Sequence, residues 1–219
     1  MEIKAVIFDL DGTLLNTLTD LSASVNYTLE RFGFPLRSER EVRSFLGNGI
    51  RALVEKSLPA GKKAMTDECL KVFKDYYDIH KDDNTAPYDG IVEMLRSVKA
   101  AGLKTAIVSN KYDAAVQYLK DVTFSGLIDF AVGEGNGIAA KPAPDGVLLA
   151  LKKLGAAKAE SVYVGDSEVD LMTAQNSGLK CVAVTWGFRD KEELIGRGAK
   201  NVIDDTDSLA STLISGRIE

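Results

Sequence analysis

Residues 3–13 read IKAVIFDLDGT, an apolar run that ends in two carboxylates. The β-branched and aromatic side chains up to Phe8 predict a buried strand. Similar short runs follow at 103–108, 130–132, 161–164, 181–184 and 201–203, with helical patterns between them. This alternation predicts an α/β fold, a doubly wound parallel-sheet (Rossmann-like) core with helices on both faces. Because ligands bind at the carboxyl ends of such strands, the residues that directly follow each run are the candidates for chemistry.

The first connection is far longer than a crossover requires. About 90 residues separate Asp9 from the next predicted strand, whereas one helix and two short loops would suffice. Capping boxes are predicted at Thr17–Asp20 and Ser38–Glu41, each ahead of apolar residues with helical spacing. Another helical stripe runs through Met65, Cys69, Val72, Phe73 and Tyr76. We therefore expect a core domain of residues 1–15 and 83–219, with an inserted all-helical cap domain of residues 16–82.

The composition is that of a globular protein of 219 residues, 45% apolar and 27% charged. Lysines and arginines number 27 against 32 acidic residues, a net charge of −5, and no basic stripe indicates a nucleic-acid partner. No apolar run reaches the roughly 18 residues of a membrane span. The two cysteines, Cys69 and Cys181, are far apart, and no export signal is evident. We expect a cytoplasmic protein with reduced thiols, without nucleic-acid or membrane partners, that is a monomer or a weak homodimer.

A single histidine, His80, excludes several chemistries. A zinc site with two histidine ligands is not available. The sequence has no G-x-S-x-G nucleophile turn, no G-x-x-x-x-G-K-[ST] loop and no G-x-G-x-x-G loop. Carboxylates, lysines and short hydroxyl side chains remain as the groups that could perform chemistry.

Two polar stretches follow the first two long apolar runs. Asp9 and Asp11 lie two residues apart at the end of the first run, so they point the same way if the strand continues, and a cation is expected nearby. A polar Asp-Gly turn is the alternative. Ser109 and Asn110 follow residues 103–108 and indicate an anion site at a helix start, or an ordinary helix N-cap.

Two further stretches complete the set. Lys141 lies in the run AKPAPD and suits a phosphate, although a surface lysine beside a helix start is the alternative. Asp166 and Asp170 follow the apolar run 161–164 and again place carboxylates at a strand end. Acidic residues there can also simply complement a helix dipole.

Taken together and in this order, the motifs Asp-x-Asp-Gly-Thr, Ser, Lys-Pro and Gly-Asp-x-x-x-Asp resemble the haloacid dehalogenase superfamily of phosphohydrolases, including its inserted helical cap. The resemblance implies that Asp9 is a nucleophile forming an aspartyl-phosphate and that Asp11 is a general acid and base. It implies Mg²⁺ as the cofactor, with Asp9, Asp11 (through its backbone carbonyl) and Asp166 as metal ligands. It further implies the phosphate-binding residues Ser109, Asn110 and Lys141, with Thr13 and Asp170 in support.

The cap carries the features expected to select the substrate. Arg43 precedes Gly47, Asn48 and Gly49, and this stretch resembles the cap loop of phosphoglycolate phosphatases, as do the runs Ser-Asn-Lys and Thr-Trp-Gly-Phe. Backbone N–H groups of the loop, with Arg43 nearby, could hold a small carboxylate, or the loop could be a plain helix–helix turn. Asn16 in place of the usual Asp and Tyr88-Asp89-Gly90 in place of Tyr-Pro-Gly are departures from the pattern.

These features predict a Mg²⁺-dependent phosphomonoester hydrolase for a small phosphorylated metabolite, with 2-phosphoglycolate as the first candidate. A phosphosugar mutase, a sugar-phosphate phosphatase and an inorganic pyrophosphatase of the same superfamily are alternatives. A phospho-acceptor signalling domain is the alternative that is not an enzyme. Against it, Asp11 favours turnover, and such a domain needs no large cap.

Overall fold

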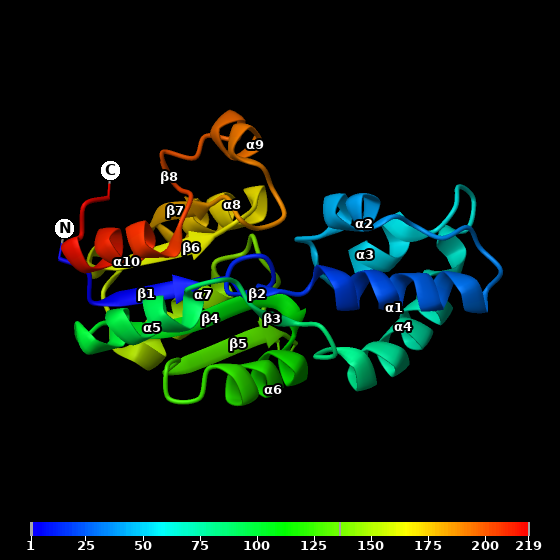
Figure 1. Cartoon of the computed structure of the whole chain (residues 1–219), viewed down its shortest axis with the longest axis horizontal. Coiled ribbons are helices and arrows are strands. Elements are labelled where there is room, and N and C mark those ends of the chain that lie inside the picture. The colour runs from blue at the N-terminus through cyan, green and yellow to red at the C-terminus, as the bar shows by residue number, and fades with distance from the viewer. Residues whose placement is uncertain (1, 136, 219) are drawn as a thin grey trace.

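The protein is described from a computed structural model that covers residues 2–135 and 137–218. A six-stranded, fully parallel sheet forms one end of the molecule and a group of helices forms the other (Figure 1). The strands are β1 (Ala5–Phe8), β4 (Lys104–Tyr112), β5 (Phe130–Glu134), β6 (Ser161–Gly165), β7 (Lys180–Val184) and β8 (Asn201–Ile203), in the order β5-β4-β1-β6-β7-β8. The first strand thus lies in the middle of the sheet, so the predicted fold class is confirmed.

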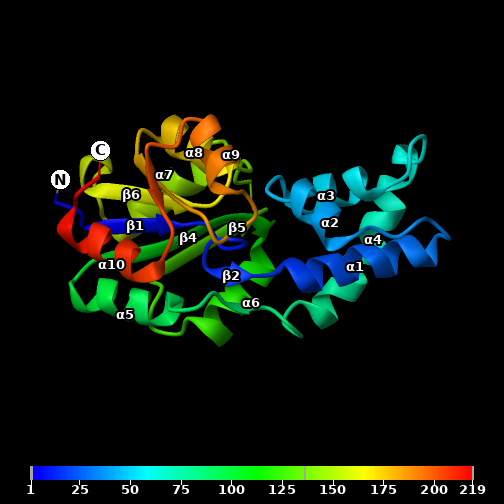
Figure 2. The same ribbon diagram turned by 45° about the horizontal axis from the view of Figure 1, so that its top comes forward.

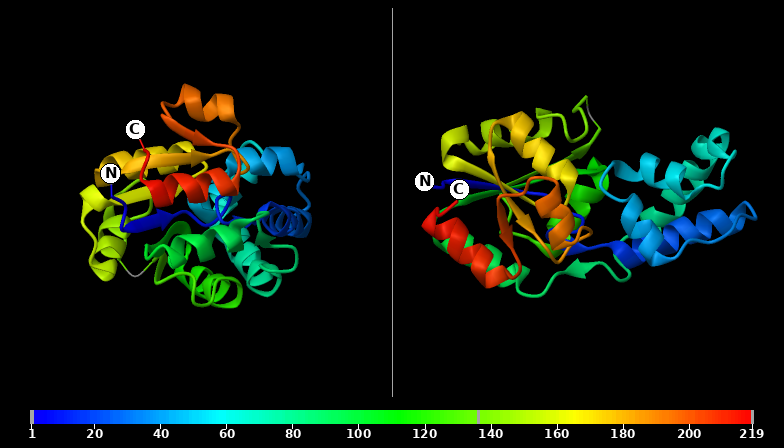
Figure 3. Two further views of the ribbon diagram at one scale, coloured as in Figure 1. Left: turned by 60° about the vertical axis from the view of Figure 1, so that its left-hand side comes forward. Right: turned by 90° about the horizontal axis from the view of Figure 1, so that it is seen from above.

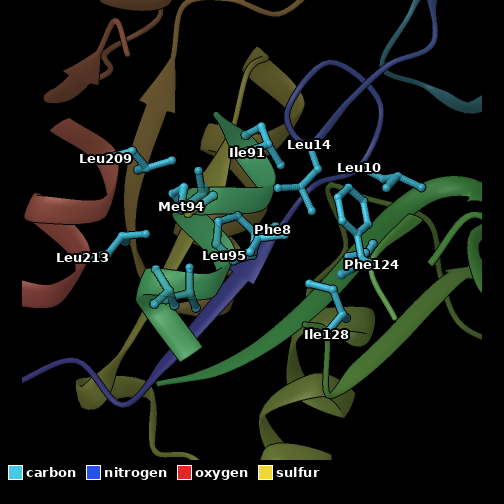
Figure 4. Close-up of a cluster of buried hydrophobic side chains, with 14 of the residues drawn as sticks. Phe8, Leu10, Leu14, Ile91, Met94, Leu95, Phe124, Ile128, Leu209 and Leu213 are labelled. Carbon is cyan, nitrogen blue, oxygen red and sulfur yellow. The ribbon is translucent and has the colours of Figure 1, made fainter. Parts of the chain in front are cut away.

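Helices cover both faces of the sheet (Figure 2). The helices of this part are α5 (Ile91–Ala100), α6 (Asp113–Thr123), α7 (Asp145–Leu154), α8 (Glu168–Ser177), α9 (Lys191–Gly196) and α10 (Thr206–Ser215), with a short 3₁₀ turn at Lys158–Glu160. Residues of β1 alternate between the faces: Val6 and Phe8 pack with α5, α6 and α10, whereas Ala5 and Ile7 pack with α7 and α8. Figure 4 shows the first of these clusters, in which Phe8 lies among side chains of α5. Because both faces of β1 are buried, its sequence is continuously apolar.

The helical end is built from residues between β1 and β4. It contains α1 (Leu18–Arg31), α2 (Glu39–Phe45), α3 (Gly49–Ser57), a 3₁₀ turn at Lys63–Met65, and α4 (Thr66–His80). These helices share a hydrophobic cluster that includes Val25, Val42, Leu53 and Phe73, and Phe188 of the core also packs in it. Two chain segments connect this cap to the sheet (Figure 3), and they pair as the short antiparallel strands β2 (Leu15–Asn16) and β3 (Ala86–Pro87). The boundaries predicted for the cap, residues 16–82, stay a prediction.

Three local predictions differ from the structure. The helix start predicted at Ser109 is wrong, because β4 continues to Tyr112 and α6 begins at Asp113. The capping box predicted at Thr17–Asp20 is also wrong: Thr17 makes no side-chain cap, and Asp20 accepts hydrogen bonds from Asn84 and Thr85 instead. In α4 the fully buried tyrosine is Tyr77, one position after the predicted Tyr76.

Two other local predictions, at Ser38 and Cys69, are confirmed. Ser38 and Glu41 form the predicted capping box at the start of α2. Cys69 is buried in the cap cluster, and both cysteines are free thiols. Over residues 2–135 and 137–218, no helix has the length and apolar character needed to cross a membrane.

Candidate active site

The sequence motifs meet at one edge of the sheet because their strands are neighbours. Asp9 follows β1, Ser109 lies near the end of β4, and Asp166 follows β6. The carboxyl ends of adjacent parallel strands share one edge, so these side chains converge. Lys141 comes from the loop before α7 and is held there by Asn110, whose Oδ1 accepts a 2.7 Å hydrogen bond from the Lys141 backbone N–H.

Three buried carboxylates surround one ammonium group. Oxygen atoms of Asp9, Asp166 and Asp170 all lie within 4.8 Å of one another. Lys141 Nζ lies 2.8 Å from Asp9 Oδ1 and 2.8 Å from Asp170 Oδ1. Burial lowers the pKa of Lys141, but the charges of Asp170 and Asp9 outweigh this and raise it above its ordinary value. Lys141 therefore stays charged, yet one ammonium cannot balance three carboxylates.

The pKa values of the carboxyl groups reflect their burial and this unbalanced charge. Burial raises the pKa of Asp9 well above its ordinary value, against the opposing charge of Lys141. Burial, followed by the charge of Asp170, raises the pKa of Asp166 to about 7. A cation beside these oxygens would relieve both effects, and a set of carboxylate oxygens is the donor type that Mg²⁺ prefers. The residues present therefore fit a divalent cation.

Asp166 is oriented by groups from both sides. Thr13 Oγ1 donates a 2.9 Å hydrogen bond to Oδ1, and the Phe188 backbone N–H donates a 2.7 Å bond to Oδ2. Gly12 lies against the same carboxylate with φ +90°, and a Cβ at Gly12 would come within 2.4 Å of Asp166 Oδ2. The Asp-Gly-Thr sequence is thus required for this close approach.

Asp170 orients Lys141. Its Oδ1 receives hydrogen bonds from Lys141 Nζ and, at 3.1 Å, from the Tyr163 hydroxyl. Its Oδ2 accepts a 2.6 Å hydrogen bond from Ser167 Oγ and a 3.1 Å bond from the Ser167 backbone N–H. With every oxygen engaged, Asp170 holds the ammonium in place toward Asp9.

Asp11 is paired with Lys111, the last residue of the Ser-Asn-Lys run, to which the sequence assigned no role of its own. Lys111 Nζ lies 2.8 Å from Asp11 Oδ1, and the Lys111 side chain is only 1% exposed. Burial lowers the pKa of Lys111, but the charge of Asp11 outweighs it and raises the pKa above its ordinary value. The signal for Lys111 was its position directly after Ser109 and Asn110, at the end of a buried strand.

Asn110 joins three parts of the site. Its Nδ2 donates 3.0 Å hydrogen bonds to the backbone oxygens of Lys141 and of Gly47 in the cap loop. These bonds hold the Asn110 side chain in place, and both Ser109 and Asn110 line the space between the core and the cap. Phosphate binding by Ser109, Asn110 and Lys141 stays a prediction.

A cavity of about 40 Å³ separates the core motifs from the cap. Its volume holds only a few water-sized groups, which favours a small ligand. The core supplies its polar wall and the cap supplies most of its apolar wall; the lining residues are Asp9, Asp11, Leu21, Leu46, Gly47, Gly49, Ile50, Leu53, Ser109, Asn110, Lys111, Lys141 and Phe188.

Comparison with known proteins agrees with this geometry. A family model described as haloacid dehalogenase-like hydrolase matches residues 6–184. This chain belongs to the haloacid dehalogenase-like hydrolases. Phosphoglycolate phosphatases from Aquifex aeolicus and Pseudomonas putida are 32% and 30% identical, over 84% and 94% of this chain and 86% and 78% of their own.

A solved structure is similar over nearly the whole length. It comes from Lactobacillus delbrueckii subsp. bulgaricus and superimposes with a TM-score of 0.94 at 36% identity, covering 97% of this chain and 99% of that one. Together, the relatives show that this haloacid dehalogenase-like hydrolase is a phosphatase.

In this hydrolase only some of the cap residues predicted to bind substrate lie at the cavity. Gly47 and Gly49 line the cavity, whereas Arg43 and Asn48 do not. Arg43 Nη2 donates hydrogen bonds to the Gly187 backbone oxygen at 2.9 Å and to Asp190 at 2.8 Å. Substrate contact by Arg43 and Asn48 stays a prediction, and the observed contacts of Arg43 hold the cap to the core.

A second arginine, also missed in the sequence, makes the reciprocal contact. Arg189 of the core donates a 3.0 Å hydrogen bond to the Leu46 backbone oxygen in the cap, while Glu168 neutralises it. Cap and core are therefore joined by an arginine from each side and by Asn110. Such contacts stabilise the closed arrangement, in which the cap excludes water from the site.

The Arg43 contact predicts a loss shared by all substrates. Arg43→Ala should lower kcat/KM about 3- to 10-fold both for a phosphomonoester with a carboxylate and for one without, because closure itself is weakened. Steady-state kinetics on both substrates check this, with Arg40→Ala, an exposed residue of the same helix, as the control. A loss confined to the carboxylate substrate would instead place Arg43 on the ligand.

Proposed function

We propose that this phosphatase hydrolyses a small phosphomonoester through an aspartyl-phosphate, with 2-phosphoglycolate as the preferred substrate. The observation that carries the proposal is the cavity in which Asp9, already contacted by Lys141, faces the same space as Asp11. The named activity of the relatives and the small volume of the cavity support the choice of substrate.

Each chemical step is assigned to a residue of this chain. Asp9 Oδ attacks phosphorus and the bond to the leaving oxygen breaks, while Asp11 donates a proton to that oxygen. Asp11 then accepts a proton from a water that attacks the same phosphorus. This breaks the Asp9–phosphorus bond and releases inorganic phosphate. Throughout, the Lys141 ammonium neutralises charge on the equatorial phosphoryl oxygens and the Ser109 hydroxyl donates a hydrogen bond to one of them.

A divalent cation fits the same site. Asp9, Asp166 and the backbone carbonyl of Asp11 would hold Mg²⁺, and when bound it supplies positive charge beside the phosphoryl group. Thr13 keeps Asp166 oriented for this role and Asp170 keeps Lys141 in place.

The site also supports expectations about assembly and location. Every proposed catalytic group comes from one chain, which supports activity as a monomer or as a weak homodimer. Two free thiols favour the cytoplasm.

A comparison of substrates tests the proposed function. With Mg²⁺ present, kcat/KM for 2-phosphoglycolate should exceed that for glucose 6-phosphate and for pyrophosphate by roughly 10-fold or more. The reason is that the cavity is small and is lined by a second ammonium group, that of Lys111. Released phosphate measures each rate, and conversion of glucose 1-phosphate to glucose 6-phosphate tests for mutase activity. Faster turnover of a sugar phosphate or of pyrophosphate would replace phosphoglycolate as the substrate.

A further inference from the structure

Two ammonium groups meet the cavity at different points. Of the described residues that line it, Lys141 and Lys111 are basic. Lys141 is committed to Asp9 and Asp170, which marks its side as the phosphoryl end. Lys111 reaches the cavity beside Asp11 and is the positive charge left for any other part of a ligand.

Lys111 is held by both parts of the protein. Its backbone belongs to β4 of the core, and its Nζ lies 4.9 Å from the centre of the Tyr77 ring on cap helix α4. The Tyr77 hydroxyl is buried beside this ammonium group and interacts with it. The core and the cap together therefore fix the position of the Lys111 charge.

The cap brings no charge of its own to this space. Its lining side chains are Leu21, Leu46, Ile50 and Leu53, which are apolar. Arg43 is bound to Gly187 and Asp190 outside the cavity. A second anionic group on the substrate would therefore have Lys111 as its available partner, since a buried charge requires an opposite charge.

We propose that Lys111 is the residue that determines specificity for a carboxylate on the substrate. The inference rests on the proposed function and adds the residue that recognises the carboxylate of the substrate. In the ligand-free protein the ammonium is paired with Asp11; when substrate binds, the carboxylate shares or takes over this ammonium. The preferred substrates are then phosphate esters of short hydroxy acids, in which carboxylate and phosphate are separated by a distance that such a small cavity can span.

The test compares an acidic substrate with its neutral analogue. 2-Phosphoglycolate and 2-hydroxyethyl phosphate differ by a carboxylate against a CH₂OH group. In Lys111→Met, the ratio of kcat/KM for the acid to kcat/KM for the neutral ester should fall roughly 10- to 100-fold, the effect of losing one charge-assisted hydrogen bond. Lys111→Arg should keep part of the ratio, and Arg43→Ala should leave it unchanged while lowering both values.

A binding measurement makes the test independent of turnover. Calorimetry with Mg²⁺ in the Asp9→Asn background should show roughly 10- to 100-fold weaker binding of 2-phosphoglycolate when Lys111→Met or Lys111→Gln is added, and a much smaller change for inorganic phosphate. Thermal melting checks that each variant is folded. If one of the two neutral variants does not fold, the other still provides the measurement.

The outcomes separate the two proposals. A folded Lys111 variant with an unchanged acid-to-neutral ratio and unchanged binding would overturn the role of Lys111 and leave the phosphatase proposal intact. Wild-type protein that hydrolyses none of these esters with Mg²⁺ would overturn the proposed function. The calorimetry would then still decide whether Lys111 binds the carboxylate.

Discussion

Asp9→Asn is expected to lower kcat by roughly a thousandfold or more on every phosphomonoester, because an amide oxygen cannot form the acyl-phosphate. The substitution keeps the size of the side chain and removes one of three clustered buried carboxylates. Since burial raises the pKa of Asp9, neutralising this position should leave the melting temperature unchanged or higher.

Kinetics and phosphoenzyme trapping check this result together. Acid quenching during turnover should trap labelled phosphate on the wild-type chain and none on Asp9→Asn, with thermal melting as the folding control. Turnover close to the wild-type rate in purified Asp9→Asn, or a label that persists there, would assign the nucleophile to another residue.

Removal of divalent cations is the second large effect. Exhaustive chelation should abolish turnover and Mg²⁺ should restore it. Without a divalent cation, the negative charges of Asp9, Asp166 and Asp170 exceed the positive charge of Lys141. The same imbalance predicts a pH-dependent stability in the metal-free protein. Burial and the charge of Asp170 raise the pKa of Asp166 to about 7 in the folded protein, whereas the pKa of an aspartate in an unfolded chain is about 3.9.

The sign follows from these two values. Between them the folded protein binds the proton more tightly than the unfolded chain does, so the free energy of unfolding falls as the pH rises from about 4 to about 7. The fall is on the order of a few kcal/mol for one such carboxyl. Above about pH 7 Mg²⁺ should raise the stability again, because it binds the ionised folded form.

Denaturant unfolding across this pH range, with and without Mg²⁺, measures the effect. Asp166→Asn is the matched control, since it should flatten the pH dependence and remove most of the stabilisation by Mg²⁺. Full activity after chelation, or a metal-free stability that rises from pH 4 to pH 7, would contradict the carboxylate cluster as a cation site.

The sheet was predictable because its central strands β1 and β6 are buried on both faces and the other strands also contain short apolar runs. The end of β4 was not, since Ser109 to Tyr112 are polar residues. The pairing of β4 with β5 shifts register after Val108 and resumes at Tyr112, which lies opposite Glu134. Asp20 illustrates the same limit: its hydrogen-bond partners, Asn84 and Thr85, lie more than sixty residues away in the chain. Local patterns cannot reveal such distant partners.

The convergence of the core motifs also followed from strand order, because Asp9, Ser109 and Asp166 lie at adjacent strand ends. The cap residues could not be assigned in this way. Whether Arg43 or Lys111 meets the cavity depends on how two separately packed hydrophobic clusters dock, and no periodicity in either segment encodes that docking.

The pairing of Leu15 with Pro87 places the two ends of the cap insertion side by side. The chain thus leaves the core and returns to it at neighbouring points, as it would through a hairpin turn. The path of the chain through the core does not depend on the residues inserted between these points. A different cap could be grafted at the same two points, or a short peptide could bridge them, without rerouting a strand. Exchange of this one module would change the wall that the cap gives to the cavity and leave the carboxylates and lysines of the core in place.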